Sequence, residues 1–206
     1  MNNPILLVGG FIEIIELCEE SNITIVGIID NCKNSEYKSI PFIGSEENIV
    51  DWANKFRQFE VVITPDSPGL RKKLATFYKD YGFNFSKIIS SQARISKSVS
   101  VSEGSVIQSG VNISSEAEIG AFVKINTNAN IMHNVSIGDF STIAPNAVLL
   151  GHVKIGQSCY IGANATILPN VSICENVTIG AGAVVTKNID TPFGIFVGVP
   201  AKLIKF

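Results

Sequence analysis

The chain has only two histidines among its 206 residues, and both lie in one stretch, IMHNVSIGDFSTIAPNAVLLGHVKIG (131–156). Imidazole binds and releases a proton near neutral pH, so a histidine beside an open space on a protein surface can act as a general base. His133 and His152 are therefore the first candidates for chemistry. The alternative for each is a solvated surface histidine without a chemical role.

Both histidines lie within a run of six-residue repeats. From Ile89 to Asp190 the chain divides into 17 hexads without an insertion. Each hexad begins with Ile, Val or Leu, and its fifth residue is Ala, Val, Ser, Cys or Ile. A period of six predicts a parallel β-helix, in which three hexads close one triangular coil of 18 residues. We therefore expect five to six coils, stacked about 4.8 Å apart.

This repeat predicts the surroundings of the histidines. Residues 18 positions apart should stack in neighbouring coils, so Gly151 should lie next to His133 in the following coil. Asn134 should lie between Glu116 and His152. The two histidines are then neighbours on one corner, and Gly151 leaves open space against the His133 ring.

Before the hexads, strand-like and helix-like runs alternate. The strands are expected at 4–10, 23–30 and 60–64, and the helices at 11–20, 45–56 and 67–82. This alternation predicts a small Rossmann-like βαβ domain with a parallel sheet. A ligand on such a sheet is expected at the carboxyl ends of the strands.

The expected domains are an α/β domain at 1–86, a β-helix at 87–188 and a C-terminal tail at 189–206. The first and last of these are expected to cover the two ends of the β-helix, because a stack of coils leaves open edges.

The composition indicates which binding partners and which cell compartment to expect. A net charge of −2 gives no reason to expect nucleic acid or an anionic membrane, and no apolar run is long enough for a membrane span. The N-terminus does not resemble a signal peptide. Cys18, Cys32, Cys159 and Cys174 lack the spacing of a zinc site, so we expect free thiols, a cytoplasmic protein and no metal. A β-helix carbonic anhydrase would need three histidines for each zinc ion.

Several motifs together resemble one enzyme family. They are hexads of the form IGxxAx, IGAGAVVTKNI (179–189), VGVPAKLIKF (197–206) and H-x-x-x-I-G-D-F (133–140), behind a βαβ domain. This arrangement is similar to the PglD/NeuD sugar acetyltransferases, which are hexapeptide-repeat acyltransferases with a left-handed β-helix. The resemblance implies a left-handed coil, a homotrimer and acetyl-CoA as co-substrate.

The resemblance also implies a reaction. It is N-acetylation of a UDP- or dTDP-linked 4-amino-dideoxy sugar, as in the biosynthesis of bacterial surface polysaccharide or lipopolysaccharide O-antigen. The alternative is O-acetylation of sialic acid or another sugar hydroxyl. The glycine turn VGGFIE (8–13) is shorter than in the family, which favours the alternative. A purely structural solenoid would show ranks of threonine and would not need two domains.

Individual residues take roles from the same resemblance. His133 matches the general base, and Asn134 occupies the position where the family often has Glu or Asp. Glu116 and Asp139 are the nearest other candidate carboxylates. For the pantetheine arm of the coenzyme, in a groove between subunits, the expected residues are Thr142, Gly151, Ala163 and Ala181. For the sugar nucleotide they are Gly9 and Gly10, with free N–H groups at a helix start, then Asp30, Asn31 and Asp66, with His152 as a wall of the acceptor site.

Overall fold

The α/β part of the chain forms a four-stranded parallel sheet in the order β3-β2-β1-β4. Its strands consist mainly of buried β-branched and aliphatic residues, as expected for a parallel sheet covered on both faces. The computed structural model describes residues 3–31 and 39–205, so Cys32 lies outside the described residues. The strands are β1 (Ile5–Val8), β2 (Ile25–Ile29), β3 (Phe42–Gly44) and β4 (Glu60–Ile63).

The helices α1 (Ile12–Glu20), α2 (Ile49–Phe56) and α3 (Pro68–Asp80) lie where the sequence predicts them. The short 3-10 helix η1 (Glu46–Asn48) forms the first turn of the second predicted helix. There the side chain of Asn48 accepts the backbone N–H of Ser45 at 2.8 Å. Strand β3 is not predicted by the sequence, because three residues are too few to show a period.

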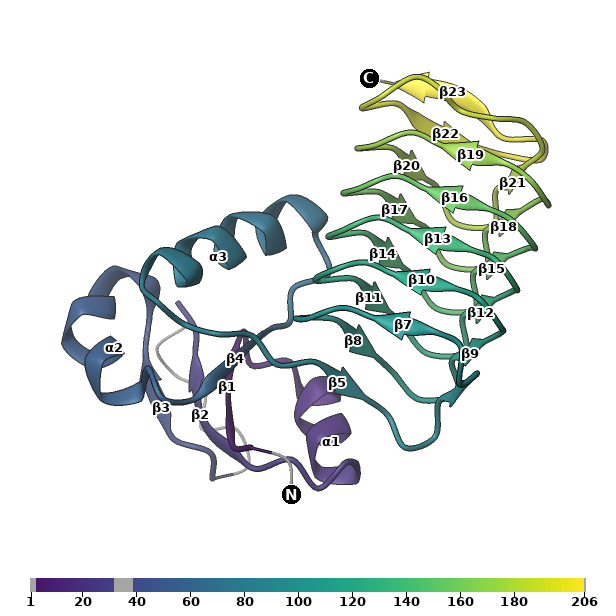
Figure 1. The fold of residues 1–206 in the computed structure, drawn as a ribbon. Helices are drawn as coiled ribbons and strands as arrows, with labels where there is room; N and C mark the ends of the chain where they lie inside the picture. The colour runs from purple at the N-terminus through teal and green to yellow at the C-terminus, as the bar shows by residue number, and fades with distance from the viewer. Residues whose placement is uncertain (1–2, 32–38, 206) are drawn as a thin grey trace.

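The hexads form a triangular prism of three parallel sheets, visible in Figure 1 as the stack that runs from teal to yellow. Ile137 pairs with Ile119 below it and Ile155 above it, so residues 18 apart do stack. The first sheet holds β5 (Ile88–Ile89), β8 (Val106–Ile107), β11 (Lys124–Ile125), β14 (Thr142–Ile143), β17 (Tyr160–Ile161), β20 (Thr178–Ile179), β22 (Ile195–Val197) and β23 (Lys202–Lys205). The second holds β6 (Arg94–Ile95), β9 (Asn112–Ile113), β12 (Asn130–Ile131), β15 (Val148–Leu149), β18 (Thr166–Ile167) and β21 (Val184–Val185). The third holds β7 (Ser100–Val101), β10 (Glu118–Ile119), β13 (Ser136–Ile137), β16 (Lys154–Ile155) and β19 (Ser172–Ile173).

The corners of the prism impose one backbone conformation. The fourth residue of most hexads has a positive φ, which asparagine tolerates better than other residues with a side chain. Asn134 has φ 58°, and five other asparagines occupy the same place in their hexads: Asn128, Asn146, Asn164, Asn170 and Asn176.

The α/β domain packs against the flank of the prism, beside its lower coils (Figure 1). Phe122 belongs to the same apolar cluster as the buried residues of β1 and β4. The expectation that this domain covers the end of the prism is therefore wrong, and Ile89, Ile95 and Val101 of the first coil stay only partly buried. At the other end β22 and β23 extend the first sheet as a hairpin.

Two of the described cysteines are buried free thiols, as the sequence predicts. Burial raises the pKa of the Cys18 thiol to about 12 and that of Cys159 to about 11, so both stay protonated near neutral pH. Cys174 is free and only partly buried. None of the described helices has the length and apolar character that crossing a membrane requires.

Candidate active site

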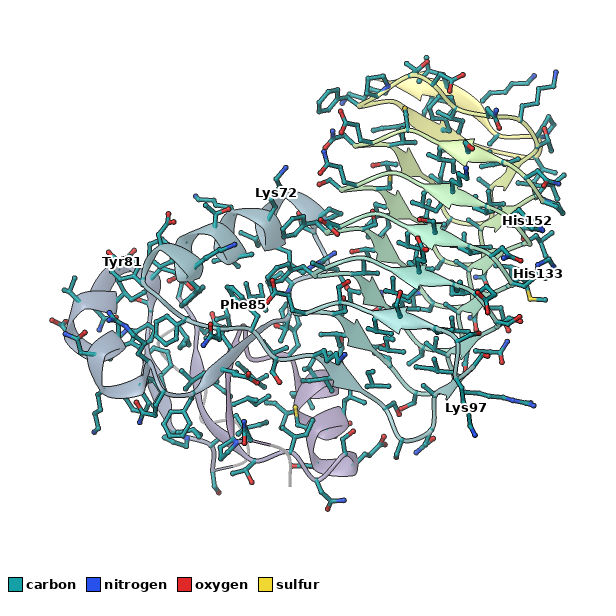
Figure 2. The ribbon with its side chains drawn as sticks, in the orientation of Figure 1. Lys72, Tyr81, Phe85, Lys97, His133 and His152 are labelled. Carbon is teal, nitrogen blue, oxygen red and sulfur yellow. The ribbon has the colours of Figure 1, made fainter. Side chains whose placement is uncertain are left out.

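The two histidines are neighbours on one edge of the prism, as the hexads predict. His133 lies in the turn between β12 and β13, and His152 lies one coil further, in the turn between β15 and β16. The N–H of His152 donates to the carbonyl oxygen of His133 at 3.0 Å. Their rings are perpendicular, with centroids 5.1 Å apart. We call residues 133–134 and 151–152 the histidine corner; Figure 2 shows both rings at the edge facing away from the α/β domain.

Gly151 makes room for the catalytic candidate. A Cβ atom at this position would lie 2.7 Å from both Cε1 and Nε2 of His133. The open space expected against the ring is therefore filled by the ring itself. Any side chain at residue 151 would displace His133.

The side chain of Asn134 contacts the ring of His133. Its Oδ1 lies 3.0 Å from Nδ1 of His133. An amide oxygen only accepts hydrogen bonds, so this contact favours the tautomer in which Nδ1 donates and Nε2 is the acceptor. Glu116 is exposed on the same corner, one coil before Asn134. Asp139 lies on another corner, where it accepts the N–H of Ala121 at 2.8 Å, and it is therefore not a partner of His133.

A second candidate site is a cavity at the carboxyl ends of the α/β sheet, where the sequence analysis expects a ligand. A cavity of about 240 Å³ is lined there by Val8, Gly9, Phe11, Ile29, Asp30, Asn31, Glu46, Pro65, Leu70 and Leu74. We call it the sheet-end pocket. Phe11 and Leu70 are each 45% exposed, so its wall offers apolar surface to a ligand. Three of the predicted substrate residues, Gly9, Asp30 and Asn31, thus meet in one place.

The glycine turn differs from the expectation. Gly9 has φ 89° and a Cβ there would lie 2.6 Å from Oγ1 of Thr64, so only glycine fits. The N–H of Gly9 donates to the carbonyl oxygen of Ile29, and the N–H of Gly10 donates to Oδ2 of Asp30 at 3.1 Å. The prediction of free N–H groups is wrong because both have partners within the protein.

Asp66 and Thr142 lie at the junction between the two domains. The carboxylate of Asp66 contacts Nζ of Lys124 at 2.9 Å, and Asp66 does not line the sheet-end pocket. Thr142 is fully buried, and its hydroxyl donates to the carbonyl oxygen of Asp66 at 2.7 Å. In this structure Thr142 cannot touch a coenzyme, which corrects the role expected for it.

The alanines form a separate edge. Ala163 is partly buried and Ala181 is exposed, and they stack in one column with Pro145. We call these three residues the alanine corner. It joins the first and second sheets, whereas the histidine corner joins the second and third. One chain alone therefore does not bring His133 to the alanines.

Comparisons with known proteins agree with this architecture. A family model described as bacterial transferase hexapeptide (six repeats) matches residues 116–151 and 152–187. One solved structure is a histidine-to-alanine variant of GDP-perosamine N-acetyl transferase from Caulobacter crescentus in complex with CoA and GDP-perosamine. It has TM-score 0.91 and 26% identity, and the match covers 98% of this chain and 97% of that one. WeeI from Acinetobacter baumannii has TM-score 0.88 and 26% identity over 98% and 99% of the two chains.

The acetyltransferase domain of PglB from Neisseria gonorrhoeae, in complex with acetyl coenzyme A, shares the fold. It has TM-score 0.87 and 24% identity, with 99% of this chain and 100% of that one covered. No curated protein matches the sequence. The chain is an acetyltransferase with a left-handed β-helix. The resemblance in the motifs and the left-handed coil are thereby confirmed.

The sequence does not predict two buried cations of the acetyltransferase. Arg71 and Lys124 are each 1% exposed at the domain junction. Burial lowers the pKa of Arg71 to about 10, and the neighbouring carboxylate of Asp66 partly opposes this. Lys124 does leave a trace in the sequence, since it is a long charged residue in a strand position that other coils fill with Val, Thr or Tyr.

Proposed function

We propose that this acetyltransferase uses acetyl-CoA to N-acetylate the 4-amino group of a nucleotide-linked sugar, with His133 as general base. The observation that carries the proposal is the contact of 3.0 Å between Nδ1 of His133 and Oδ1 of Asn134, because a ring that donates from Nδ1 can accept a proton at Nε2. The relative that binds CoA and GDP-perosamine supports an amino sugar on a nucleotide. The setting is the cytoplasmic assembly of bacterial surface glycans, such as the lipopolysaccharide O-antigen.

The reaction assigns a task to the histidine corner. The sugar amine forms a bond to the thioester carbonyl carbon, and the carbon–sulfur bond breaks as the thiolate leaves. Nε2 of His133 accepts the proton that the attacking nitrogen loses. Asn134 orients the ring but cannot stabilise imidazolium by charge. His152 stands beside the ring as a wall of the acceptor site.

The sheet-end pocket suits the nucleotide. Phe11 and Leu70 offer apolar surface for a base, and Asp30 offers a carboxylate that can accept hydrogen bonds from a base or ribose. Gly10 supports the pocket indirectly, through its N–H to Asp30. Asp66 is held by Lys124 at 2.9 Å and contributes to the junction between the two domains.

The complete site needs a second copy of the chain. The alanine corner has small side chains that let an extended pantetheine arm approach the backbone. It lies on a different edge from His133, and the histidine corner faces away from its own α/β domain (Figure 2). Packing the alanine corner of one copy beside the histidine corner of the next would complete the site, and a homotrimer achieves this with closed symmetry.

O-acetylation of sialic acid or another sugar hydroxyl is the second candidate. One observation favours it: Gly9 and Gly10 use their N–H groups inside the protein, so the turn offers a diphosphate fewer donors than expected. A sugar without a nucleotide would not need such donors.

A panel assay separates the two reactions. CoA release is measured with 4-amino sugars linked to UDP, dTDP or GDP, and with free sialic acid, each at the same acetyl-CoA concentration. The proposal expects turnover with at least one nucleotide-linked amino sugar and none with sialic acid. Turnover with sialic acid alone would replace it by O-acetylation.

A further inference from the structure

Arg71 is buried where the α/β domain meets the prism. It lies in the first turn of α3, and its side chain is 1% exposed. Charged side chains are almost never buried so deeply unless hydrogen bonds satisfy them. The placement of this guanidinium therefore calls for a structural or functional reason.

The guanidinium joins three segments of the chain. Nε, Nη1 and Nη2 all donate, at distances of 2.6–3.1 Å. The acceptors are the carbonyl oxygens of Pro65 and Asp66 after β4, of Phe122 at one coil and of Phe140 and Ser141 at the next, and the hydroxyl of Thr142. Nearly all are backbone groups in fixed places, which suits the planar fork of arginine.

The segment after β4 is held by two cations in succession. Nζ of Lys124 donates to the carbonyl oxygen of Thr64 at 2.9 Å, and Arg71 takes the next two carbonyl oxygens. Pro65 lines the sheet-end pocket, so this segment is one of its walls. The wall is thus fixed by α3 and by strand β11 of the prism.

The corner that meets Arg71 is built for docking. Phe122 and Phe140 have φ 56° and 62°, a conformation that bulky residues rarely adopt and that other coils fill mostly with asparagine or glycine. Their rings stack with centroids 5.1 Å apart, and Phe85 meets Phe122 edge to face at 4.8 Å. The carbonyl oxygens of both phenylalanines accept from Arg71.

We propose that Arg71 is a positioning residue for acetyl transfer. It fixes the pocket wall Thr64–Asp66 relative to the prism, so that an acceptor anchored in the sheet-end pocket reaches the thioester in one geometry. The inference rests on the proposed function. Reacting atoms must lie about 3–3.5 Å apart, and a displacement of about 1 Å can cost about 100-fold in rate.

The test is Arg71→Lys, which keeps the charge and removes the fork. The matched control is Arg57→Lys, since Arg57 is exposed at the end of α2. Amide exchange of residues 60–67 is measured without substrate, alongside kcat/KM for the nucleotide-linked acceptor and the Kd of acetyl-CoA. For Arg71→Lys we expect about tenfold faster exchange, a fall of about 10–100-fold in kcat/KM and a Kd within about twofold. The control should match the wild type in all three.

Unchanged amide exchange of residues 60–67 in Arg71→Lys would overturn the inference. A loss of acetyl-CoA affinity as large as the loss in kcat/KM would also overturn it. Because exchange is read without substrate, a wild-type protein inactive on every nucleotide-linked amino sugar would refute the proposed function separately. If Arg71→Lys does not fold, Lys124→Met removes the contact to Thr64 and is put through the same measurements. Unchanged exchange and rate in that variant would equally contradict a pocket wall fixed from the prism.

Discussion

Asn134 connects the chemistry of the site to the geometry of the coil. Its positive φ explains why an asparagine suits this place, and its side-chain oxygen lies 3.0 Å from Nδ1 of His133. The position often carries a carboxylate in the family that the motifs resemble. In this enzyme Asn134 therefore orients the proposed base but does not stabilise its protonated form by charge.

Replacing Asn134 by aspartate tests that distinction. A carboxylate favours imidazolium, so the acidic limb of the rate profile for Asn134→Asp should move to higher pH by about one unit. The measurement is kcat/KM for the acceptor against pH. Asn176→Asp is the control, because Asn176 has φ 59° on another corner. An acidic limb that stays in place would mean that residue 134 does not influence the proton acceptor.

For single residues, the sequence predicts those positions that the six-residue repeat determines. The 18-residue coil puts His133, Gly151 and His152 on one corner, and the structure agrees. It does not predict that Gly9 and Gly10 use their N–H groups internally, since that depends on Ile29 and Asp30 from a distant strand. The burial of Thr142 is not predicted either, because α3, which covers it, is far away in the sequence.

Among the elements, the hexad strands are the most predictable because each repeats the same local pattern. Ile137 is 2% exposed, and the first residues of the hexads from Ile107 onward are likewise buried in the prism. The short strand β3 lacks such a pattern. The place where the α/β domain docks is also not predicted from the sequence. Its trace in the sequence is that Phe122 and Phe140 stand at a hexad position that is mostly asparagine or glycine elsewhere.

The coils make a stability prediction. Ile137→Ala should lower the free energy of unfolding by about 2–5 kcal/mol, because it leaves a cavity between coils. Lys154→Ala, on the neighbouring strand but exposed, should change it by less than about 0.5 kcal/mol. Denaturant unfolding of both variants gives the comparison. Similar losses would contradict the assignment of inward and outward positions.

In the whole molecule, the parts of the proposed site lie far from one another. The sheet-end pocket, the alanine corner and the histidine corner lie on different parts of one chain, and the hexads alone do not reveal where the α/β domain sits relative to them. The alanine corner and the histidine corner are separated because they are different corners of the prism, and the pocket is separated from His133 because the α/β domain lies on another flank. This separation is also the reason to expect an assembly.

The expected assembly is a trimer. Static light scattering should give about three times the chain mass of 22.1 kDa, at concentrations where the enzyme is active. Dilution that dissociates the trimer should abolish turnover, since the site then lacks a neighbour's residues. A monomer with full activity would contradict a site shared between copies.

Steady-state turnover of His133→Ala tests the central claim most directly. The His133 side chain is exposed, so the variant should fold, assemble and bind acetyl-CoA as the wild type does. Its kcat with the nucleotide-linked amino sugar should fall by about 10²–10⁴, which is the usual contribution of a positioned base. A His133→Ala enzyme with near-wild-type kcat, together with an inactive His152→Ala enzyme, would contradict the account and move the base to His152.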